Sequence, residues 1–289
     1  MNRNSKKIRV AAVQMKFRRE LEANIEFIER VVRELAKDGT DAILFPECAL
    51  TGYNCDFAAV TRSAIETGLT RVSSAARQSG CHVLVGSPTF AGRKRFNSLV
   101  GFDRRGREVC CYNKIHLTAR DAQFFVPGNT PGFFHLGDVP CAAIICHERR
   151  YPELVRLGVM LGAQVVFHPN AGLDILAVSR NKRRGRDGMA VRAFENQVFY
   201  VFANSVGPQG EGLWSAGDSK IVAPDSRVLA LADNRRAMTV QAELDLTQAG
   251  RLYAREALEQ PVFLRSAWKA MLASCKRQLR RVSSAQSER

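Results

Sequence analysis

Three residues of types that perform nucleophilic chemistry stand where a predicted strand gives way to a loop: Glu47, Lys114 and Cys146. A thiol becomes a strong nucleophile when it is ionised, a nearby carboxylate can take its proton, and a nearby ammonium can lower its pKa. Taken singly, each residue has a commoner explanation, as a solvated turn carboxylate, a surface lysine and an inert core thiol. Their function therefore depends on whether the fold brings them together.

The elements that must position these residues alternate between strand and helix patterns. An apolar strand, a helix with apolar residues at helical spacing and a second strand form a β-α-β unit that delivers Glu47 at its carboxyl end. A predicted hairpin around an Arg-Arg-Gly turn leads directly to Lys114. The predicted elements in this half are strands at 8–14, 42–45, 82–86, 97–103 and 107–113, and helices at 21–35 and about 64–78.

The second half repeats the alternation after a loop at 119–132 that carries two Pro-Gly pairs. Cys146 again stands at the end of a strand. The predicted elements are strands at 133–136, 141–145, 164–168, 198–204, 219–223, 228–231 and 238–244, and helices at 152–161 and 188–196, before a basic C-terminal helix. We find no short tandem repeat and no low-complexity linker, which favours one mixed α/β domain.

Several blocks of the sequence resemble the signature segments of the nitrilase superfamily of carbon-nitrogen hydrolases. The resemblance runs from about Ile8 to about Leu246, in the family's order and spacing. The blocks are FPECALTGY (45–53), NKIHL (113–117) with FFVPGN (124–129), ICHERRYPEL (145–154), RAFENQ (192–197), FANSVG (202–207) and GDSKIVAPD (217–225). The resemblance implies a four-layer α-β-β-α sandwich, and we expect a catalytic domain at 1–250 followed by a basic helical extension and tail at 251–289.

The resemblance also implies a catalytic triad of Glu47, Lys114 and Cys146 that hydrolyses a small amide or carbamoyl compound through a thioester, without a metal or cofactor. Cys146 would attack the carbonyl carbon, and Lys114 with the backbone N–H of His147 would stabilise the oxyanion. Glu47 would protonate the departing ammonia or amine and then activate water. We expect the His147 side chain to face away, since neighbours on an extended chain point to opposite sides.

Many family members carry a second glutamate after the lysine, and the position aligned with it here holds Asp121, whose side chain is shorter. Glu148 is the other acid nearby. Both are candidates for a supporting role. As the alternative for Glu148, we consider a structural residue that pairs with one of three arginines, Arg149, Arg150 or Arg192.

Four further residues are predicted to line the substrate pocket, from the resemblance and from the usual aromatic lining of small-molecule sites. They are Tyr53, His168, Asn170 and Trp214. His168, like His116, stands at a strand end and is alternatively a hydrogen-bonded scaffold residue.

The formal net charge of +15 is the one composition signal that points elsewhere, because basic surfaces attract nucleic acids and other polyanions. Much of the charge lies in residues 180–186 and in the tail from Lys269 onward. Neither segment interleaves aromatic with basic residues, as a base-stacking surface would. We therefore favour a solvated basic face over a nucleic-acid site and do not expect a nucleic-acid partner.

Targeting and metal signals are absent from the sequence. The apolar stretch near the N-terminus is shorter than a secretory signal needs, and no apolar run approaches the roughly 20 residues of a spanning helix. The eight cysteines are spread along the chain without a C-x-x-C pair, and no H-x-x-x-H pair occurs. We expect a cytoplasmic protein with reduced, mostly buried thiols, no metal and no membrane association.

Several functions remain open on these grounds. Amide or carbamoyl hydrolysis is the first choice, and nitrile hydrolysis is the near alternative because the triad is shared. A basic polyanion-binding protein on the same fold is the alternative from another class, and a positive field that steers an anionic amide into the pocket is a third possibility. The resemblance also predicts a homodimer or higher homo-oligomer.

Overall fold

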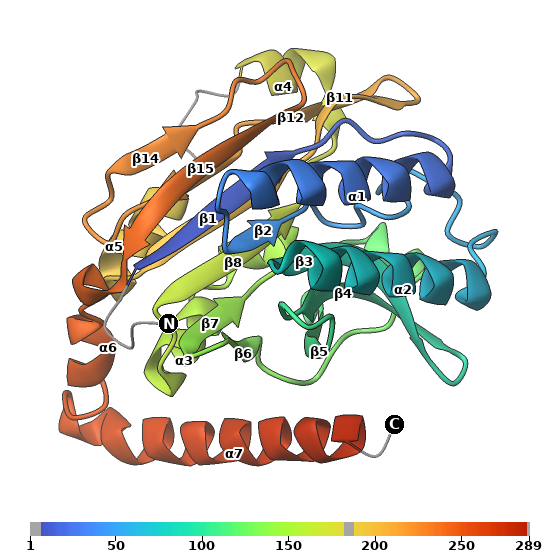
Figure 1. The fold of residues 1–289 in the computed structure, drawn as a ribbon. Coiled ribbons are helices and arrows are strands. Elements are labelled where there is room, and N and C mark those ends of the chain that lie inside the picture. The colour runs from blue at the N-terminus through green and yellow to red at the C-terminus, as the bar shows by residue number, and fades with distance from the viewer. Residues whose placement is uncertain (1–6, 182–187, 288–289) are drawn as a thin grey trace.

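Two six-stranded sheets packed face to face form the centre of the molecule (Figure 1). The computed structural model describes residues 7–181 and 188–287, so most of the basic segment 180–186 lies outside the described residues. The first sheet has the order β15-β1-β2-β3-β4-β5. Its strands are β1 (Lys7–Gln14), β2 (Ala42–Leu44), β3 (His82–Ala91), β4 (Lys94–Phe102), β5 (Glu108–Asn113) and β15 (Met238–Asp245).

The second sheet has the order β14-β13-β10-β8-β7-β6. Its strands are β6 (Phe133–Leu136), β7 (Val139–Ala143), β8 (Val165–Asn170), β10 (Phe199–Asn204), β13 (Lys220–Val222) and β14 (Val228–Leu231). The central strands of each sheet, β1-β2-β3 and β7-β8-β10, are parallel, and each of the outer strands is antiparallel to the strand it pairs with on its inner side. A small third sheet contains β9 (Asp174–Ile175), β11 (Val206–Gly210) and β12 (Leu213–Ala216).

Helices cover the outer faces of both large sheets. The first sheet is covered by α1 (Leu21–Lys37) and α2 (Arg62–Ser79), and the second by α3 (Pro152–Leu161) and α5 (Met189–Asn196). Further helices are α4 (Leu176–Asn181), α6 (Leu252–Glu256), α7 (Val262–Ser287) and the 3₁₀ turns η1 (Asp121–Gln123), η2 (Cys146–Arg150) and η3 (Leu246–Gln248). The predicted four-layer α-β-β-α sandwich is confirmed.

Parallel strands buried on both faces explain the continuous apolar runs in the sequence. In β2, Ile43 packs into the core shared with α1 and α2, whereas Leu44 packs into the core between the two sheets. The α1 residues Ile28 and Val32 recur at helical spacing and enter the same outer core as Ile43. A local signal also sets the start of α2, because the Thr61 side chain accepts a hydrogen bond from the N–H of Ala64.

The hairpin before Lys114 is part of a longer meander than the sequence pattern indicated. Strand β3 continues to Ala91 and pairs with β4 over its whole length, and β4 then pairs with β5. The predicted strand at 82–86 was therefore too short. The second half of β3, SPTFA, contains a proline and passes from buried to exposed, so it lacks the continuous apolar pattern of the first half.

Beyond the sandwich, α6 contacts α3 and α5, and α7 runs along one edge of the molecule (Figure 1). Helix α7 buries Leu272 and Cys275 and leaves Phe263 78% exposed. In the part of the chain that the structure describes, no helix has the length and apolar character needed to cross a membrane.

Candidate active site

The two sheets bring Glu47, Lys114 and Cys146 together at their carboxyl ends. Glu47 follows β2 and Lys114 follows β5, both in the first sheet, while Cys146 follows β7 in the second. Glu47 and Lys114 are completely buried, and Cys146 is 9% exposed. The electrostatic coupling of Cys146 to both other residues places the three side chains in one site.

Lys114 is held between two carboxylates. Its Nζ lies 2.7 Å from Glu47 Oε1 and 2.7 Å from Asp121 Oδ2. Burial alone would lower the pKa of this ammonium, but the neighbouring carboxylates outweigh burial and raise it well above its usual value. Lys114 is therefore a fixed cation in the resting site.

Asp121 reaches Lys114 despite its short side chain, because the chain turns back toward the site before it. The η1 turn begins at Asp121, and the carboxylate Oδ2 accepts hydrogen bonds from the N–H and the hydroxyl of Thr118, both at 2.9 Å. Although burial opposes ionisation, the Lys114 charge and these hydrogen bonds hold the pKa of Asp121 below its usual range. Asp121 is thus a second anion beside the lysine.

Asn97, which we did not predict as a site residue, connects the two carboxylates. Its Nδ2 donates to Glu47 Oε1 at 2.8 Å and to Asp121 Oδ1 at 3.3 Å. The hydroxyl of Tyr53 also donates to Asp121 Oδ1, at 2.9 Å. The only sequence signal for Asn97 is a polar residue at the start of the apolar stretch of β4, and many buried amides share it.

The second carboxylate oxygen of Glu47 faces the other sheet. Oε2 accepts a hydrogen bond of 3.0 Å from the N–H of Ala171, directly after β8. Burial is the largest influence on Glu47 and raises the pKa of its carboxyl, with Asp121 acting in the same direction and Lys114 opposing. A carboxylate with a raised pKa is a better proton acceptor than a solvated one.

Cys146 stands at a sharp elbow between β7 and η2. Its backbone φ of +51° lies in the left-handed region, which non-glycine residues seldom adopt. Beneath it, Nε2 of the buried His168 lies 3.1 Å from the Cys146 carbonyl oxygen, and His168 Nδ1 lies 2.9 Å from the Tyr200 hydroxyl. His168 therefore donates from Nε2 and accepts at Nδ1, which holds the elbow in place.

The thiol is protonated in the resting site. Burial raises the pKa of Cys146 to about 12, and the charge of Glu47 acts in the same direction. The charges of Lys114 and Arg149 lower the pKa but do not compensate. Lys114 thus lowers the pKa of the thiol, as expected of a nearby ammonium, but burial and the charge of Glu47 outweigh it.

Glu148 does not pair with any of the three arginines considered above. Its carboxylate accepts from the Tyr112 hydroxyl at 2.9 Å and from the backbone N–H groups of Ile115 at 2.7 Å, His116 at 3.2 Å and Ile145 at 2.6 Å. These bonds connect the segment after Lys114 with the segment before Cys146. Glu148 thus joins the two sheets directly behind the site.

The reason given for an outward His147 side chain was wrong. Cys146 and His147 begin a 3₁₀ turn instead of continuing an extended strand, and His147 lines the cavity described below. Its ring packs edge to face on Tyr151 at a centroid distance of 5.8 Å. The start of η2 also leaves the first backbone N–H groups without acceptors inside the turn.

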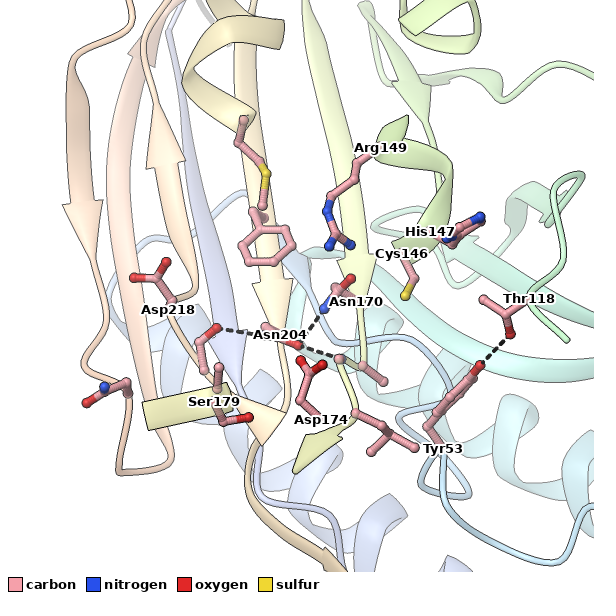
Figure 2. A pocket seen from close by; sticks show the side chains of 18 of the residues that line it. Tyr53, Thr118, Cys146, His147, Arg149, Asn170, Asp174, Ser179, Asn204 and Asp218 are labelled. Carbon is pink, nitrogen blue, oxygen red and sulfur yellow. Dashed lines mark hydrogen bonds between the residues drawn. The ribbon is translucent and has the colours of Figure 1, made fainter. Parts of the chain in front are cut away.

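A cavity of about 720 Å³ opens onto Cys146 (Figure 2). Of the residues predicted to line it, Tyr53 and Asn170 do so, and Thr118, Arg149 and Asn204 are among the further lining residues. His168 is fully buried behind Cys146, and Trp214 lies in β12 outside the lining. The structure therefore brings only two of the four predicted pocket residues to the cavity.

The eight cysteines are all free, as predicted, and most are buried. Within residues 7–181 and 188–287, no group of three histidine, cysteine or acidic side chains is arranged to hold a metal ion.

Comparison with known proteins decides the family. The model of the family "Carbon-nitrogen hydrolase" matches residues 9–254. The chain belongs to this family. The resemblance seen in the sequence is thereby confirmed.

Two curated relatives share about a third of their residues with this hydrolase. A nitrilase of Pyrococcus abyssi (strain GE5 / Orsay) is 32% identical over 247 residues, which cover 83% of this chain and 90% of the relative. A 2-oxoglutaramate amidase of Bacillus subtilis (strain 168) is 31% identical over 252 residues, with the same coverage of 83% and 90%.

Solved structures show the same fold. An amidase from Nesterenkonia sp. AN1, solved as a double mutant in complex with acrylamide, superposes with a TM-score of 0.79 at 22% identity. The match covers 93% of this chain and 99% of that one. The two proteins therefore share the sandwich over nearly their whole length.

Proposed function

We propose that this carbon-nitrogen hydrolase cleaves a small amide or carbamoyl compound through a thioester on Cys146, with Glu47 as the base and Lys114 as the oxyanion cation. The observation that carries the proposal is the buried arrangement at the cavity. A neutral thiol lies close to a carboxylate of raised pKa, next to a lysine fixed between two anions.

Acylation begins when Glu47 takes the thiol proton as the Cys146 sulfur attacks the carbonyl carbon. Because the thiol is protonated at rest, proton transfer accompanies the attack. The carbonyl oxygen becomes an oxyanion beside Lys114 Nζ and the backbone N–H of His147, and each such donor is worth roughly 10²–10³ in rate. The carbon-nitrogen bond then breaks as Glu47 returns the proton to the departing ammonia or amine.

Deacylation uses the same groups. Water takes the place of the departed amine, Glu47 accepts a proton from it, and the resulting hydroxide attacks the thioester carbon. The carbon-sulfur bond breaks, and the proton on Glu47 returns to the Cys146 sulfur. The product is a carboxylic acid from an amide, or a carbamic acid that decomposes to carbon dioxide and an amine or ammonia from a carbamoyl compound, and the resting site is restored.

Supporting roles follow from the contacts. We propose that Asp121 orients Lys114 and maintains the raised pKa of Glu47, and that Glu148 fixes the spacing between the lysine segment and the cysteine elbow. His168 positions Cys146 from behind. Tyr53 and Asn170 are proposed to contact substrate, since both line the cavity.

Nitrile hydrolysis is the second candidate, favoured by the relative from Pyrococcus abyssi that is named a nitrilase. The same thiol could add to a nitrile carbon and give a thioimidate, which water converts to the acid and ammonia. The triad geometry is common to both reactions. The two are separated by the substrate from which ammonia is released.

Ammonia release from a panel of amides, carbamoyl compounds and nitriles tests the proposal. We expect turnover of at least one amide or carbamoyl compound by the wild type, no turnover by Cys146→Ala, and near wild-type rates for the control Cys275→Ala, whose thiol lies on α7. Turnover that persists in Cys146→Ala, or turnover of nitriles alone, would contradict amide hydrolysis through Cys146.

The polyanion-binding alternative has little support in the described residues, because residues 182–186 of its basic segment lie outside them. It predicts binding that weakens steeply with salt and survives in Cys146→Ala. This alternative would be supported if the folded wild type released ammonia from none of the panel compounds but bound a labelled oligonucleotide in a filter-binding assay.

We also propose a cytoplasmic homodimer, in which residues 251–289 extend the catalytic domain of residues 1–250. Free cysteines support a reducing compartment. Exposed apolar side chains support an interface: Phe194 on α5 is 53% exposed, and Val262 and Phe263 on α7 are 62% and 78% exposed. Light scattering coupled to gel filtration tests this, and a monomer mass at micromolar concentration would contradict it.

A further inference from the structure

One arginine of the cavity lining is placed next to the reacting sulfur. Arg149 belongs to η2, three residues after Cys146, and lines the same cavity. In Figure 2 its side chain extends from the turn toward Asn170, while the Cys146 sulfur points into the open space beside it. The Arg149 charge is close enough to lower the pKa values of Cys146 and His168.

Among the described residues, no carboxylate forms an ion pair with the Arg149 guanidinium. Arg192, the arginine next to it, pairs with Glu195 at 3.0 Å. Another arginine of the lining, Arg120, donates to the side chain of Asn54. Arg149 is therefore a cation in the cavity whose five donors remain for a ligand.

A second unmet group faces the same cavity. Asn170 is 4% exposed, and its Nδ2 donates to Asn204 Oδ1 at 2.8 Å. Its Oδ1 is buried and accepts no hydrogen bond. A buried acceptor without a donor costs free energy, so this position favours a ligand that brings an N–H group.

The acidic residues of the lining do not neutralise this side of the cavity. Asp218 pairs with the buried Lys220 at 2.7 Å. Asp174 and Asp218 lie away from the η2 turn in Figure 2, and Glu47 is committed to Lys114, Asn97 and Ala171. The positive charge next to Cys146 is therefore available to an anionic part of the substrate.

We infer that the substrate is an amide or carbamoyl compound that carries a carboxylate, and that Arg149 determines this specificity by binding the carboxylate while the Asn170 Oδ1 accepts a substrate N–H. The inference rests on the proposed hydrolysis at Cys146. A guanidinium matches a carboxylate with two parallel hydrogen bonds, which fixes the orientation of the substrate as well as its affinity. The scissile carbonyl can then be held against the sulfur.

The test compares substrates that differ only in the carboxylate. Succinamate is paired with 4-oxopentanamide, and glutaramate with 5-oxohexanamide, so that a methyl ketone replaces the carboxylate at equal chain length. The measured quantity is the ratio of kcat/KM between acid and ketone. Any effect of the Arg149 charge on the thiol acts on both substrates and cancels in this ratio.

For the wild type, we expect the acid to be preferred in at least one pair. Arg149→Met should lower that ratio by about 10- to 100-fold, and Arg149→Lys by less, because an ammonium keeps the charge but loses the paired geometry. Arg93→Met removes a charge from the exposed β3–β4 turn and should leave the ratio unchanged. A ratio for Arg149→Met within about 3-fold of the wild type would overturn the inference.

Binding separates this inference from the proposed function. In Cys146→Ala, calorimetric titration with succinamate and glutaramate should show binding that Arg149→Met abolishes. Turnover of the ketones with no Arg149-dependent binding would refute the specificity and leave the hydrolysis intact. Arg149-dependent binding with no turnover of any amide by the wild type would support the recognition and refute the hydrolysis.

Discussion

Asp121→Asn removes one of the two negative charges that hold Lys114, at almost constant volume. The Asp121 carboxylate accepts five hydrogen bonds: from Lys114 Nζ and the Thr118 N–H and hydroxyl on one oxygen, and from Tyr53 and Asn97 on the other. An asparagine has one acceptor oxygen, so its NH₂ must face donors on one side. At least two of the five bonds are lost.

The magnitude follows from these contacts. Each buried hydrogen bond to a charged acceptor is worth about 1.5 kcal/mol or more, so the free energy of unfolding should fall by about 3 kcal/mol. A displaced Lys114 should lower kcat by about 10²-fold. Because the Asp121 charge raises the pKa of Glu47, its removal lowers that pKa. The acid limb of the kcat/KM profile should therefore move to lower pH.

Urea denaturation and a pH profile of kcat/KM measure these effects together. Asp103→Asn is the matched control, since Asp103 accepts three hydrogen bonds at the β4–β5 turn, from the backbone of Arg105 and from the backbone and side chain of Arg107. It should lower stability without moving the acid limb. An Asp121→Asn enzyme with kcat within 3-fold of the wild type and an unmoved acid limb would refute the role assigned to Asp121.

Three further predictions concern the frame of the site. Glu148→Gln replaces one carboxylate oxygen with an NH₂ group, which then faces hydroxyl and N–H donors. We expect kcat to fall by about 10-fold or more with little change in KM. An unchanged kcat would contradict the role of Glu148 in fixing the spacing of the site. Burial lowers the pKa of His168 from 6.5 to about 3. As the pH falls below 6.5, the His168 ring therefore becomes protonated in the unfolded chain but stays neutral in the folded chain. Between pH 7 and pH 5 the wild type should therefore lose about 2 kcal/mol more stability than His168→Gln; parallel curves from urea titrations would contradict this. In Gly86→Ala the new Cβ would lie 2.2 Å from the Pro46 carbonyl oxygen, next to Glu47. We expect it to cost about 3 kcal/mol and to depress kcat, as measured by urea titration and ammonia release, and a stable, active variant would contradict this.

The fold and the triad could be predicted because their signals are local. Apolar runs marked the parallel strands, and Glu47, Lys114 and Cys146 each follow such a strand or the hairpin of the first sheet. In layered α/β folds, sites are built at these ends. The family blocks also predicted that these three residues, which are far apart in the chain, meet in one site. The spacing of apolar residues alone could not predict this.

Other features depend on contacts through space. The partners of Glu148 are a tyrosine and backbone N–H groups from the segments that follow two different strands, and the arginines considered as partners do not pair with it. The left-handed backbone at Cys146 turned His147 toward the cavity, although the preceding apolar run indicated extended chain. The protonated thiol likewise results from burial, which no motif reveals.

The most direct test of the central claim is to observe the acyl group on Cys146. The wild type is mixed with an amide that it hydrolyses, quenched in acid within its first turnovers, and analysed by intact-mass and peptide mass spectrometry. We predict a mass increase equal to the acyl group minus one hydrogen, located on Cys146 rather than on Cys141 of the same tryptic peptide, and absent from Cys146→Ala. Acylation of a residue other than Cys146 during turnover would contradict the account. Hydrolysis of the same amide by Cys146→Ala would also contradict it.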